Sequence, residues 1–589
     1  MSDTAATPDE VVPESEATRL GGLYSWQSLV FIALCATGLL FGLAYVFGWS
    51  WGDRRLYEGE YYWVFIGVFT AAAFIALPAT RGQRNVPIYD VAAVLALSVS
   101  VYFAAHAWDI VQSGWTNMPF GVVIWLLMLE LARRSGGFPF LLVVVVLGLY
   151  PLFADYLPGL LMGIPYDFDR MIEAHVFRAE GMMGITTKIV AEIVLGFLVF
   201  AGVLIATGAG TFFIDLANAG FGRYRGGPAK VAVVASAFFG SLSGSIFSNI
   251  AGTGSLTIPT MKKVGYPPHY AGAIEACAST GGVVMPPVMG AIAFVMAITI
   301  GVDYATVMVA AIVPSLLFYF GLLLQVDAYA ARMNLHGMPA DKLPSARRVL
   351  KRGWPFILVL VFLVWGLLYK RWEYYAPWYA CVLMVSLGGG NICLVILFGV
   401  VACFIMGMAG LAIVAYIFLA VTLAPAIIEL GQLNVIAVHF FIIYYAMLSA
   451  ITPPVGAAAF LAATIAGARP MKTSFTAMRL GIVIYFVPLF FLFQPALVLQ
   501  GDLTPLLWVL PSIIIGIMLI SGGLEAYLLG VGKVAGWLRL PLGLAGFAFS
   551  FPGLLTTAIG GISSAILVAL VWRDNRRAAA GAPNLGVNS

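Results

Sequence analysis

Hydroxyl and amide side chains are concentrated in one glycine-rich stretch, residues 240–259, of an otherwise apolar chain. Their oxygens, together with carbonyls of unwound backbone, are the ligands that a hard cation such as Na⁺ needs, and helix N-termini there suit a carboxylate. The alternative is that glycine and serine only allow close helix packing. We interpret the stretch as a binding site for an ion or a substrate. Its candidate residues are Ser243, Ser245, Ser248, Asn249, Gly252, Thr253, Gly254 and Thr257, with Ser248, Asn249 and Thr253 as candidate Na⁺ ligands.

A second stretch offers two more hydroxyls just before a double proline. Two prolines in mid-membrane remove helical hydrogen bonds and free backbone carbonyls. Hydrocarbon tolerates such a break only where the backbone faces protein or a wet cavity, so we expect the break to line the same site. The candidate residues here are Ser279, Thr280, Gly281, Pro286 and Pro287.

Glu275 lies one helical turn before Ser279. A carboxylate inside a membrane segment is a functional candidate by default, and proton coupling is the role that we consider for it. The structural alternative is a helix-end carboxylate that pairs with Lys262 or Lys263. The sequence favours neither interpretation.

The double proline recurs at Pro453-Pro454, in a less polar setting. Ser449 and Thr452 precede it, and the glycine-rich tip of this copy begins at Gly407. An ion site in this copy would depend on backbone carbonyls, Ser449 and Thr452. A matched pair of interrupted segments in the two halves of a chain points to the binding site of a secondary transporter.

The composition indicates a polytopic membrane protein. The 589 residues are 61% hydrophobic and only 10% charged, with a mean hydropathy of +0.97. No soluble domain has this composition. The net charge of +4 is spread over loops, so it gives no reason to expect a nucleic-acid partner. The five cysteines occur singly, without the spacing of a metal site, and we expect no cofactor.

Apolar spans and polar ends divide the chain into six parts. We predict a disordered cytoplasmic tail (1–20), N-terminal helices (21–180), a first transport repeat with a hairpin and a broken helix (181–350), a second, inverted repeat (351–500), C-terminal helices (501–572) and a tail (573–589). The acidic first residues lack the basic region of a signal peptide.

Loop charges give the expected orientation. Arginine-rich loops place the N-terminus of this multi-pass protein in the cytoplasm by the positive-inside rule. Residues 231–261 have basic segments at both ends, so they are predicted to enter the membrane and turn back as a re-entrant helical hairpin. Residues 391–430 are predicted to form a second hairpin from the opposite side. The fold class is therefore an all-α polytopic membrane protein with inverted repeats, two re-entrant hairpins and two proline-broken helices.

Several runs resemble the large membrane subunit of the tripartite ATP-independent periplasmic (TRAP) transporters, in the fused form that works with TAXI-type binding proteins. They are RGGPAKVAVVASA (225–237), TIPTMK (257–262), ASTGG (278–282) with MPPVMG (285–290), and LQVD (324–327). The resemblance covers roughly residues 180–572. The first five spans resemble the fused small subunit.

The resemblance implies an elevator mechanism. A transport domain made of hairpins and broken helices would carry substrate and ions past a fixed scaffold. The implied partners are the lipid bilayer, a periplasmic TAXI-type substrate-binding protein and the small organic acid that it delivers for import. The implied coupling ion is Na⁺ or H⁺, without ATP and without enzymatic activity.

The second copy departs from the family pattern. It has Gly410-Leu411-Ala412-Ile413 where relatives carry Gly-Leu-Pro-Thr-Thr, and Ala450 where they carry asparagine. The chain is also short between the repeats, by about two spans. We therefore expect the first copy to carry the chemistry. The competing interpretations are a degenerate relative that does not transport, a channel, and a membrane enzyme.

Overall fold

Residues 24–51, 54–80, 86, 91–159, 162–339, 341, 343–388, 411–453 and 455–580 are described by the computed structural model. Almost all secondary structure in these residues is helical, and the strands form two short antiparallel pairs. Eight of the described helical segments are long and apolar enough to cross a membrane. The predicted all-α polytopic membrane fold is therefore confirmed. The predicted tail at 1–20, Gly407 and Pro454 lie outside the described residues.

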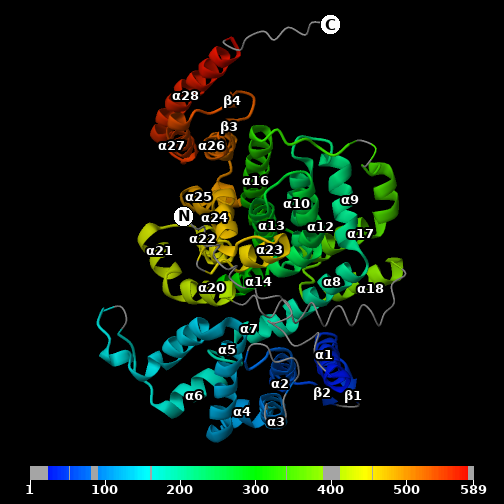
Figure 1. Ribbon diagram of the computed structural model, residues 1–589. Coiled ribbons are helices and arrows are strands. Elements are labelled where there is room, and N and C mark those ends of the chain that lie inside the picture. The colour runs from blue at the N-terminus through cyan, green and yellow to red at the C-terminus, as the bar shows by residue number, and fades with distance from the viewer. Residues whose placement is uncertain are drawn as a thin grey trace, which may run out of the picture. The chain divides into compact units, whose positions relative to one another are not determined.

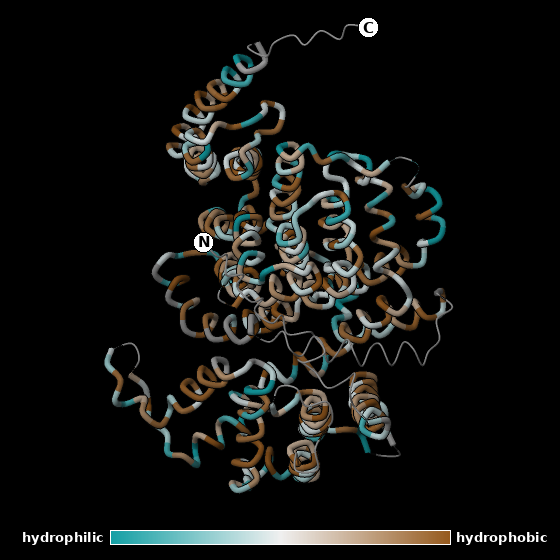
Figure 2. The backbone as a smooth tube through the Cα atoms, viewed as in Figure 1, coloured by the Kyte–Doolittle hydropathy of each residue, from teal (hydrophilic) through white to brown (hydrophobic). Residues whose placement is uncertain are grey.

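The chain forms two compact units. The first comprises residues 1–203 and 372–408, and the second comprises 204–371 and 409–589. Figure 1 labels their elements, and Figure 2 shows that hydrophobic residues dominate the helices of both units.

The first unit is built on helices α1 and α2, which a short β-hairpin connects. Its elements are α1 (Ser25–Val46), β1 (Ser50–Trp51), β2 (Arg54–Arg55), α2 (Glu58–Ala76), α3 (Ala92–Ala105), α4 (Ala107–Ser113), α5 (Met118–Leu149), the 3-10 helices η2 (Tyr150–Leu152) and η3 (Ala154–Tyr156), α6 (Phe168–Val176), α7 (Ile185–Ile189), the π-helix η5 (Val190–Val194), α8 (Leu195–Ala206) and α18 (Ala376–Gly388). Aromatic side chains fill its core, where the ring centroids of Trp63 and Phe103 are 4.7 Å apart and those of Phe103 and Phe177 are 5.1 Å apart.

This unit extends beyond the boundary predicted at residue 180. The hydroxyl of Tyr61 donates to the carbonyl of Ala191 at 2.7 Å, and that of Tyr62 donates to Glu192 Oε1 at 2.6 Å. These buried contacts hold η5 against α2. The Nζ of Lys188, in the preceding helix α7, lies 3.7 Å from Glu58 Oε1.

Helix α5 is interrupted at Gly137, whose φ of 75° and ψ of −175° are non-helical and open mainly to glycine. Two helical segments meet at this kink. The side chain of Asn117 caps the helix start by accepting from the Phe120 amide. Helix α5 ends at Leu149, and 3-10 turns follow.

The second unit contains both double prolines. Its elements are α9 (Ala209–Phe221), α10 (Gly227–Ser243), α11 (Ile246–Asn249), the π-helix η6 (Ile250–Gly254), α12 (Ser255–Lys263), α13 (Pro268–Gly282), α14 (Ala291–Ile300), α15 (Tyr304–Ala310), α16 (Ile312–Arg332), α17 (Ala346–Leu368), α20 (Leu411–Thr422), α21 (Ala424–Gly431), α22 (Val435–Met447), the 3-10 helix η8 (Leu448–Ala450), α23 (Ala457–Ala466), α24 (Pro470–Leu480), α25 (Val483–Phe493), the 3-10 helix η9 (Pro495–Val498), α26 (Leu506–Glu525), β3 (Tyr527–Leu528), β4 (Gly532–Lys533), α27 (Gly536–Ser550) and α28 (Leu554–Ala580).

Residues 227–263 form the first predicted hairpin. Helix α10 has 17 residues and is therefore about 25 Å long, less than the roughly 30 Å hydrocarbon core of a bilayer. It ends at Gly244, whose φ of 62° lets the chain reverse. The chain returns through α11, η6 and α12, which pack against α10 (Figure 1). The reversal lies at the start of the predicted tip.

Both predicted broken helices are present. The first consists of α13 and α14, separated by residues 283–290, and the second consists of α22 with η8 and α23, separated by residues 451–456. Of the predicted second hairpin, α20 and α21 are described, and residues 391–410 lie outside the described residues.

The C-terminal region contains two apolar helices, α27 and α28, which follow α26 as predicted. The stretch at 525–539, predicted to lie along the membrane interface, contains a strand pair in which Tyr527 faces Lys533. Helix α28 continues to Ala580, so the predicted tail at 573–589 is wrong for its first residues. The reason is Asn575, whose side chain accepts from the Lys533 amide at 3.1 Å and donates to its carbonyl at 2.8 Å, holding the helix end against β4.

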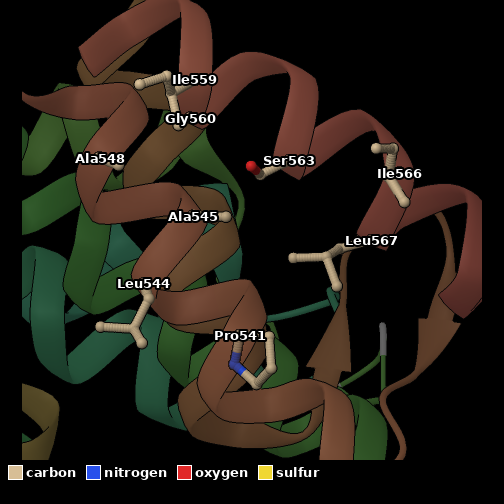
Figure 3. A pocket seen from close by; sticks show the side chains of 9 residues that line it. All are labelled: Pro541, Leu544, Ala545, Ala548, Ile559, Gly560, Ser563, Ile566 and Leu567. Carbon is tan, nitrogen blue, oxygen red and sulfur yellow. The ribbon is translucent and has the colours of Figure 1, made fainter.

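An apolar cavity of about 480 Å³ separates α27 from α28. Figure 3 shows its lining, in which Ser563 supplies a hydroxyl among aliphatic side chains from both helices. The lining holds no charged group, so this cavity offers no ligand chemistry of its own.

One ion-pair cluster ties the start of the hairpin to α16. Asp327 accepts from Arg225, and from Lys230 Nζ at 2.5 Å. The side chains of Asp327 and Lys230 are only 12% and 14% exposed, so the pair is largely shielded from water. Removing one partner of a buried pair leaves the other charge uncompensated.

We predict that Asp327→Asn lowers the free energy of unfolding by about 3 kcal/mol, because two cations lose their shielded partner. Asp303→Asn is the matched control, since Asp303 pairs with Arg371 at 3.5 Å on an exposed surface. The control should change stability by less than about 1 kcal/mol. Thermal unfolding of the purified chain measures both, and equal losses would contradict the buried ion-pair account.

Candidate functional site

Glu275 of α13 is fully buried against the hairpin. Its Oε1 accepts from Ser236 Oγ at 2.7 Å and from Thr253 Oγ1 at 2.6 Å, and its Oε2 accepts from Thr257 Oγ1 at 2.6 Å. Ser279 Oγ lies 3.4 Å from Oε1, one turn along the same helix. The carboxylate therefore joins both arms of the hairpin to the broken helix.

Thr253 connects this carboxylate to Asn249. The Thr253 hydroxyl lies 2.8 Å from the Asn249 carbonyl, 3.1 Å from Asn249 Oδ1 and 2.9 Å from Ser236 Oγ. Asn249 Nδ2 donates to the Ser236 carbonyl at 2.8 Å. A hydroxyl has one proton to give, so Thr253 has more acceptors around it than it can satisfy. The cluster is rich in oxygen acceptors.

The charge of Glu275 has no cationic partner among the residues that the structure describes. The alternative pairing with Lys262 is wrong, because Lys262 Nζ donates to the Ala466 carbonyl at 2.7 Å. Lys263 is exposed and forms no ion pair with Glu275 either. An ionised carboxylate buried without a partner costs several kcal/mol, so this site needs a proton or a bound cation.

Glycines permit the close approach that brings Glu275 to the hairpin. A Cβ on Gly254 would lie 2.9 Å from Glu275 Cγ, and a Cβ on Gly240 would lie 2.7 Å from the Gly282 backbone and 2.6 Å from Asn249 Nδ2. A Cβ on Gly244 would likewise collide with the carbonyl oxygen of Met289. Larger residues at these positions would push α10 and η6 away from α13.

Side chains from other elements satisfy the first proline break. The Tyr304 hydroxyl bonds the Val288 carbonyl and also lies 2.9 Å from the Pro287 carbonyl. The Val288 amide donates to the Ser241 carbonyl of the hairpin at 2.9 Å. The break is thus buried in protein, as hydrocarbon requires.

The structure brings together some of the predicted residues and not others. Asn249, Thr253, Thr257, Ser279 and Glu275 converge in one cluster. The other hydroxyls and glycines have different roles. Ser245 caps α11, Thr280 bonds the Ala276 carbonyl of its own helix, Gly252 packs on the Phe239 ring, and Gly281 packs on Phe318 and Tyr319.

Two buried hydroxyls at the hairpin tip remain available for a ligand. Ser243 Oγ and Ser248 Oγ have no hydrogen-bond partner within the described part of the chain. Both residues are only 1% exposed. Buried hydroxyls are normally satisfied, so these two are candidates for contact with a ligand.

The second break has fewer polar groups. Thr452 Oγ1 lies 2.6 Å from the Tyr485 hydroxyl, and Ser474 Oγ donates to the Ile451 carbonyl at 2.8 Å. Ser449 bonds the Ala446 carbonyl of its own helix at 2.9 Å, and Pro453 lies in the turn. The η6 and α11 segments of the first hairpin contact α23, so the two repeats meet at the hairpin tip.

The sequence reasoning missed Ser236 and a buried tyrosine–histidine pair. Ser236, Gly240 and Ser243 are spaced by four and three residues, so they form a small polar stripe on one face of α10 that could have identified Ser236. The hydroxyl of Tyr416 lies 2.8 Å from His439 Nδ1 within the second repeat. Tyr416 and His439 meet only because α20 packs against α22, and their spacing in the sequence does not indicate this contact.

Comparison with protein families decides the identity. Residues 123–387 and 382–506 match the family described as "Tripartite ATP-independent periplasmic transporter, DctM component". The chain belongs to this family. The match begins at residue 123, inside the predicted N-terminal helices, and the domain boundary predicted at residue 180 stays a prediction.

Several curated relatives of this DctM family member are named as TRAP permeases. The C4-dicarboxylate TRAP transporter large permease protein DctM of Pseudomonas aeruginosa is 36% identical over 160 residues, which is 27% of this chain and 35% of the relative. The isethionate TRAP transporter permease protein DctMQ of Oleidesulfovibrio alaskensis is 38% identical over 92 residues, 15% of this chain and 14% of the relative. The ectoine/5-hydroxyectoine permease UehC of Ruegeria pomeroyi is 25% identical over 248 residues, 41% of this chain and 56% of the relative. The chain thus spans well under two thirds of these relatives.

The close contact at Gly240 predicts how an alanine substitution changes the stability of this DctM family member. Gly240→Ala should lower the free energy of unfolding by about 1–3 kcal/mol, because its Cβ meets the backbone of Gly282 and the amide of Asn249. Gly220→Ala is the matched control, since a Cβ there meets nothing within 4 Å and alanine favours the helix by about 0.5–1 kcal/mol. Thermal unfolding compares the two variants. Equal stability would contradict close packing of hairpin on broken helix.

Proposed function

We propose that the chain is the membrane permease of an ion-driven importer for small organic anions, in the bacterial inner membrane with its N-terminus in the cytoplasm. The observation that carries the proposal is the buried Glu275 cluster at the meeting point of hairpin and broken helix. Family membership supports the transport role. No ATP is consumed, and the gradient of a coupling ion drives uptake.

The coupling ion of this proposal is the proton. The oxygens around Glu275 lie within hydrogen-bond distance of one another, with 2.6 Å to Thr253 and 2.9 Å from Thr253 to Ser236. A proton on Glu275 Oε1 would be donated to Thr253 Oγ1, which then donates to the Asn249 carbonyl. Every donor in that chain has an acceptor. Na⁺ held by Asn249, Thr253 and Glu275 is the alternative, and it would need these oxygens to move apart.

Neutralising Glu275 would couple the ion to the substrate. With the charge removed, the carboxyl can remain buried between the hairpin and α13 at lower cost, and this contact positions the hairpin tip. The organic anion of the proposal binds at that tip, where Ser243 and Ser248 hold unpartnered buried hydroxyls. Ion and substrate then share one rigid element, and an elevator movement of this element carries both across the bilayer.

A periplasmic TAXI-type binding protein delivers the substrate in this proposal. The helices that precede the DctM match support it, because a fused small subunit would lie in this part of the chain. The C4-dicarboxylates named for the Pseudomonas relative are the first substrates to test.

The first test is uptake of labelled small carboxylates into vesicles that contain the purified chain, with the cognate binding protein outside. We expect accumulation with an inward proton gradient in Na⁺-free buffer, and none with a Na⁺ gradient at equal pH. Uptake driven by Na⁺ alone would assign Na⁺ to the cluster. Uptake without the binding protein would contradict the tripartite system, and no uptake at all by a folded chain would indicate a degenerate relative.

Glu275→Gln should reduce gradient-driven uptake at least about 100-fold, because the variant is permanently neutral and no longer exchanges the proton. Its melting temperature should be kept, since the amide preserves the shape and most hydrogen bonds. Glu429→Gln, at an exposed carboxylate of α21, is the matched control and should transport normally. Undiminished proton-driven uptake by Glu275→Gln would remove Glu275 from the coupling mechanism.

The hydroxyl of Thr253 gives an independent test. Thr253→Val removes the link between Glu275 and Asn249 and should abolish coupled uptake, as should Asn249→Ala, while Thr253→Ser retains the hydroxyl and should retain uptake. Thr464→Val is the control, because that hydroxyl bonds only the Phe460 carbonyl of its own helix among the described contacts. If Thr253→Val keeps wild-type ion dependence, the hairpin cluster does not hold the ion.

A further inference from the structure

A basic cavity of about 730 Å³ lies where α13, α16 and α24 meet. Four permanently charged cations line it, namely Arg332, Arg469, Lys472 and Arg479, together with His269. Loop charges predict the cytoplasmic side for this end of the helices. Cavities of this size hold small ligands, and this one suits an anion.

One carboxylate organises two of the cations. Glu525 Oε1 lies 3.1 Å from Arg479 Nη2, and its Oε2 lies 3.4 Å from Arg332 Nη2. Arg479 Nε is buried and has no hydrogen-bond partner within the described part of the chain. Arg469 and Lys472 form no ion pair in that part either, so the lining keeps an excess of positive charge.

An apolar groove of about 540 Å³ starts at the same arginine. Arg479 lines both hollows, and Arg539 joins it at the polar end of the groove. Beyond them the lining is apolar and includes Phe486, Leu540 and Phe547. Leu540 is 72% exposed, so the groove opens to the surroundings of the helices, which in a membrane protein are acyl chains.

We propose that these two hollows together bind an anionic glycerophospholipid. The phosphate and anionic headgroup would lie among the cations that line the basic cavity, and an acyl chain would lie along the groove. The charge excess selects an anionic lipid over a zwitterionic one. The shared arginine selects a lipid over a free anion, because a free anion leaves the apolar groove unfilled.

The surroundings of Arg539 support a position of the lipid headgroup near the membrane surface. Its guanidinium donates to the carbonyls of Gly523 at 2.9 Å and Leu524 at 2.6 Å, which ends α26 at this level. The neighbouring Trp537 is 65% exposed, as expected for an aromatic side chain at a membrane interface. The site would therefore hold α16, α24, α26 and α27 together through a lipid.

The test uses the full chain, delipidated in detergent, with three separate probes: palmitoyl-oleoyl-phosphatidylglycerol, palmitoyl-oleoyl-phosphatidylcholine and inorganic phosphate. Native mass spectrometry measures retained lipid, and thermal unfolding measures stabilisation. We expect retention and a raised melting temperature with phosphatidylglycerol, and neither with the other two probes. Equal retention of phosphatidylcholine would overturn the proposal, and so would full stabilisation by phosphate alone.

Variants of each half of the site sharpen the test. Arg469→Gln with Lys472→Gln should weaken phosphatidylglycerol binding roughly 30-fold, about fivefold for each cation. Arg347→Gln with Arg348→Gln, two exposed cations outside the cavity, is the charge control and should bind normally.

Gly543→Phe should block the groove, because a Cβ there meets nothing within 4 Å and the ring fills the hollow without moving the backbone. Gly543→Leu is the smaller substitute if the phenylalanine variant does not fold. Ser563→Phe, which fills the uncharged cavity between α27 and α28 (Figure 3), is the matched control. Unchanged phosphatidylglycerol retention in either the headgroup variant or the groove variant would overturn the proposal.

Discussion

The structure depends on one buried carboxylate that has no cationic partner in the described residues. Glu275 lies between a hairpin and a broken helix, and four hydroxyls surround it. Apart from Ser279 of its own helix, these hydroxyls come from the hairpin, so the carboxylate determines how the hairpin sits on α13. Its charge is costly in this place, and the cost falls when a proton or a cation binds. An ion gradient can therefore act on the geometry of the whole site through this one group.

Glycines and prolines make that contact possible. The double proline lies in the break between α13 and α14, where Tyr304 satisfies the carbonyls of Pro287 and Val288. Gly240, Gly244 and Gly254 let the hairpin come within contact of the broken helix. The second repeat has the same break but other chemistry around it. Thr452 bonds Tyr485, and Ile451 is capped by Ser474, so the described polar groups there satisfy one another. The two repeats share an architecture and differ in their polar side chains.

Sequence patterns predicted the architecture and part of the site. Proline pairs and loop charges predicted the broken helices and the first hairpin, because those signals act locally and through membrane sidedness. Asn249, Thr253, Thr257 and Glu275 were each recognised, yet their convergence depends on how η6 packs against α13, which no spacing reveals. Ser236 was missed, although its spacing to Gly240 and Ser243 along α10 could have identified it, and Thr280 was included although it bonds its own helix.

The most direct measurement counts the coupling cations that the purified chain binds, with and without the Glu275 carboxylate. A pH-indicator dye reports protons, and radioactive sodium reports Na⁺, for the wild type and for Glu275→Gln. We expect the variant to bind one proton fewer per chain than the wild type and to show no change in sodium. If both proteins bind the same number of protons and sodium ions, Glu275 is not the coupling site, and the central claim is wrong.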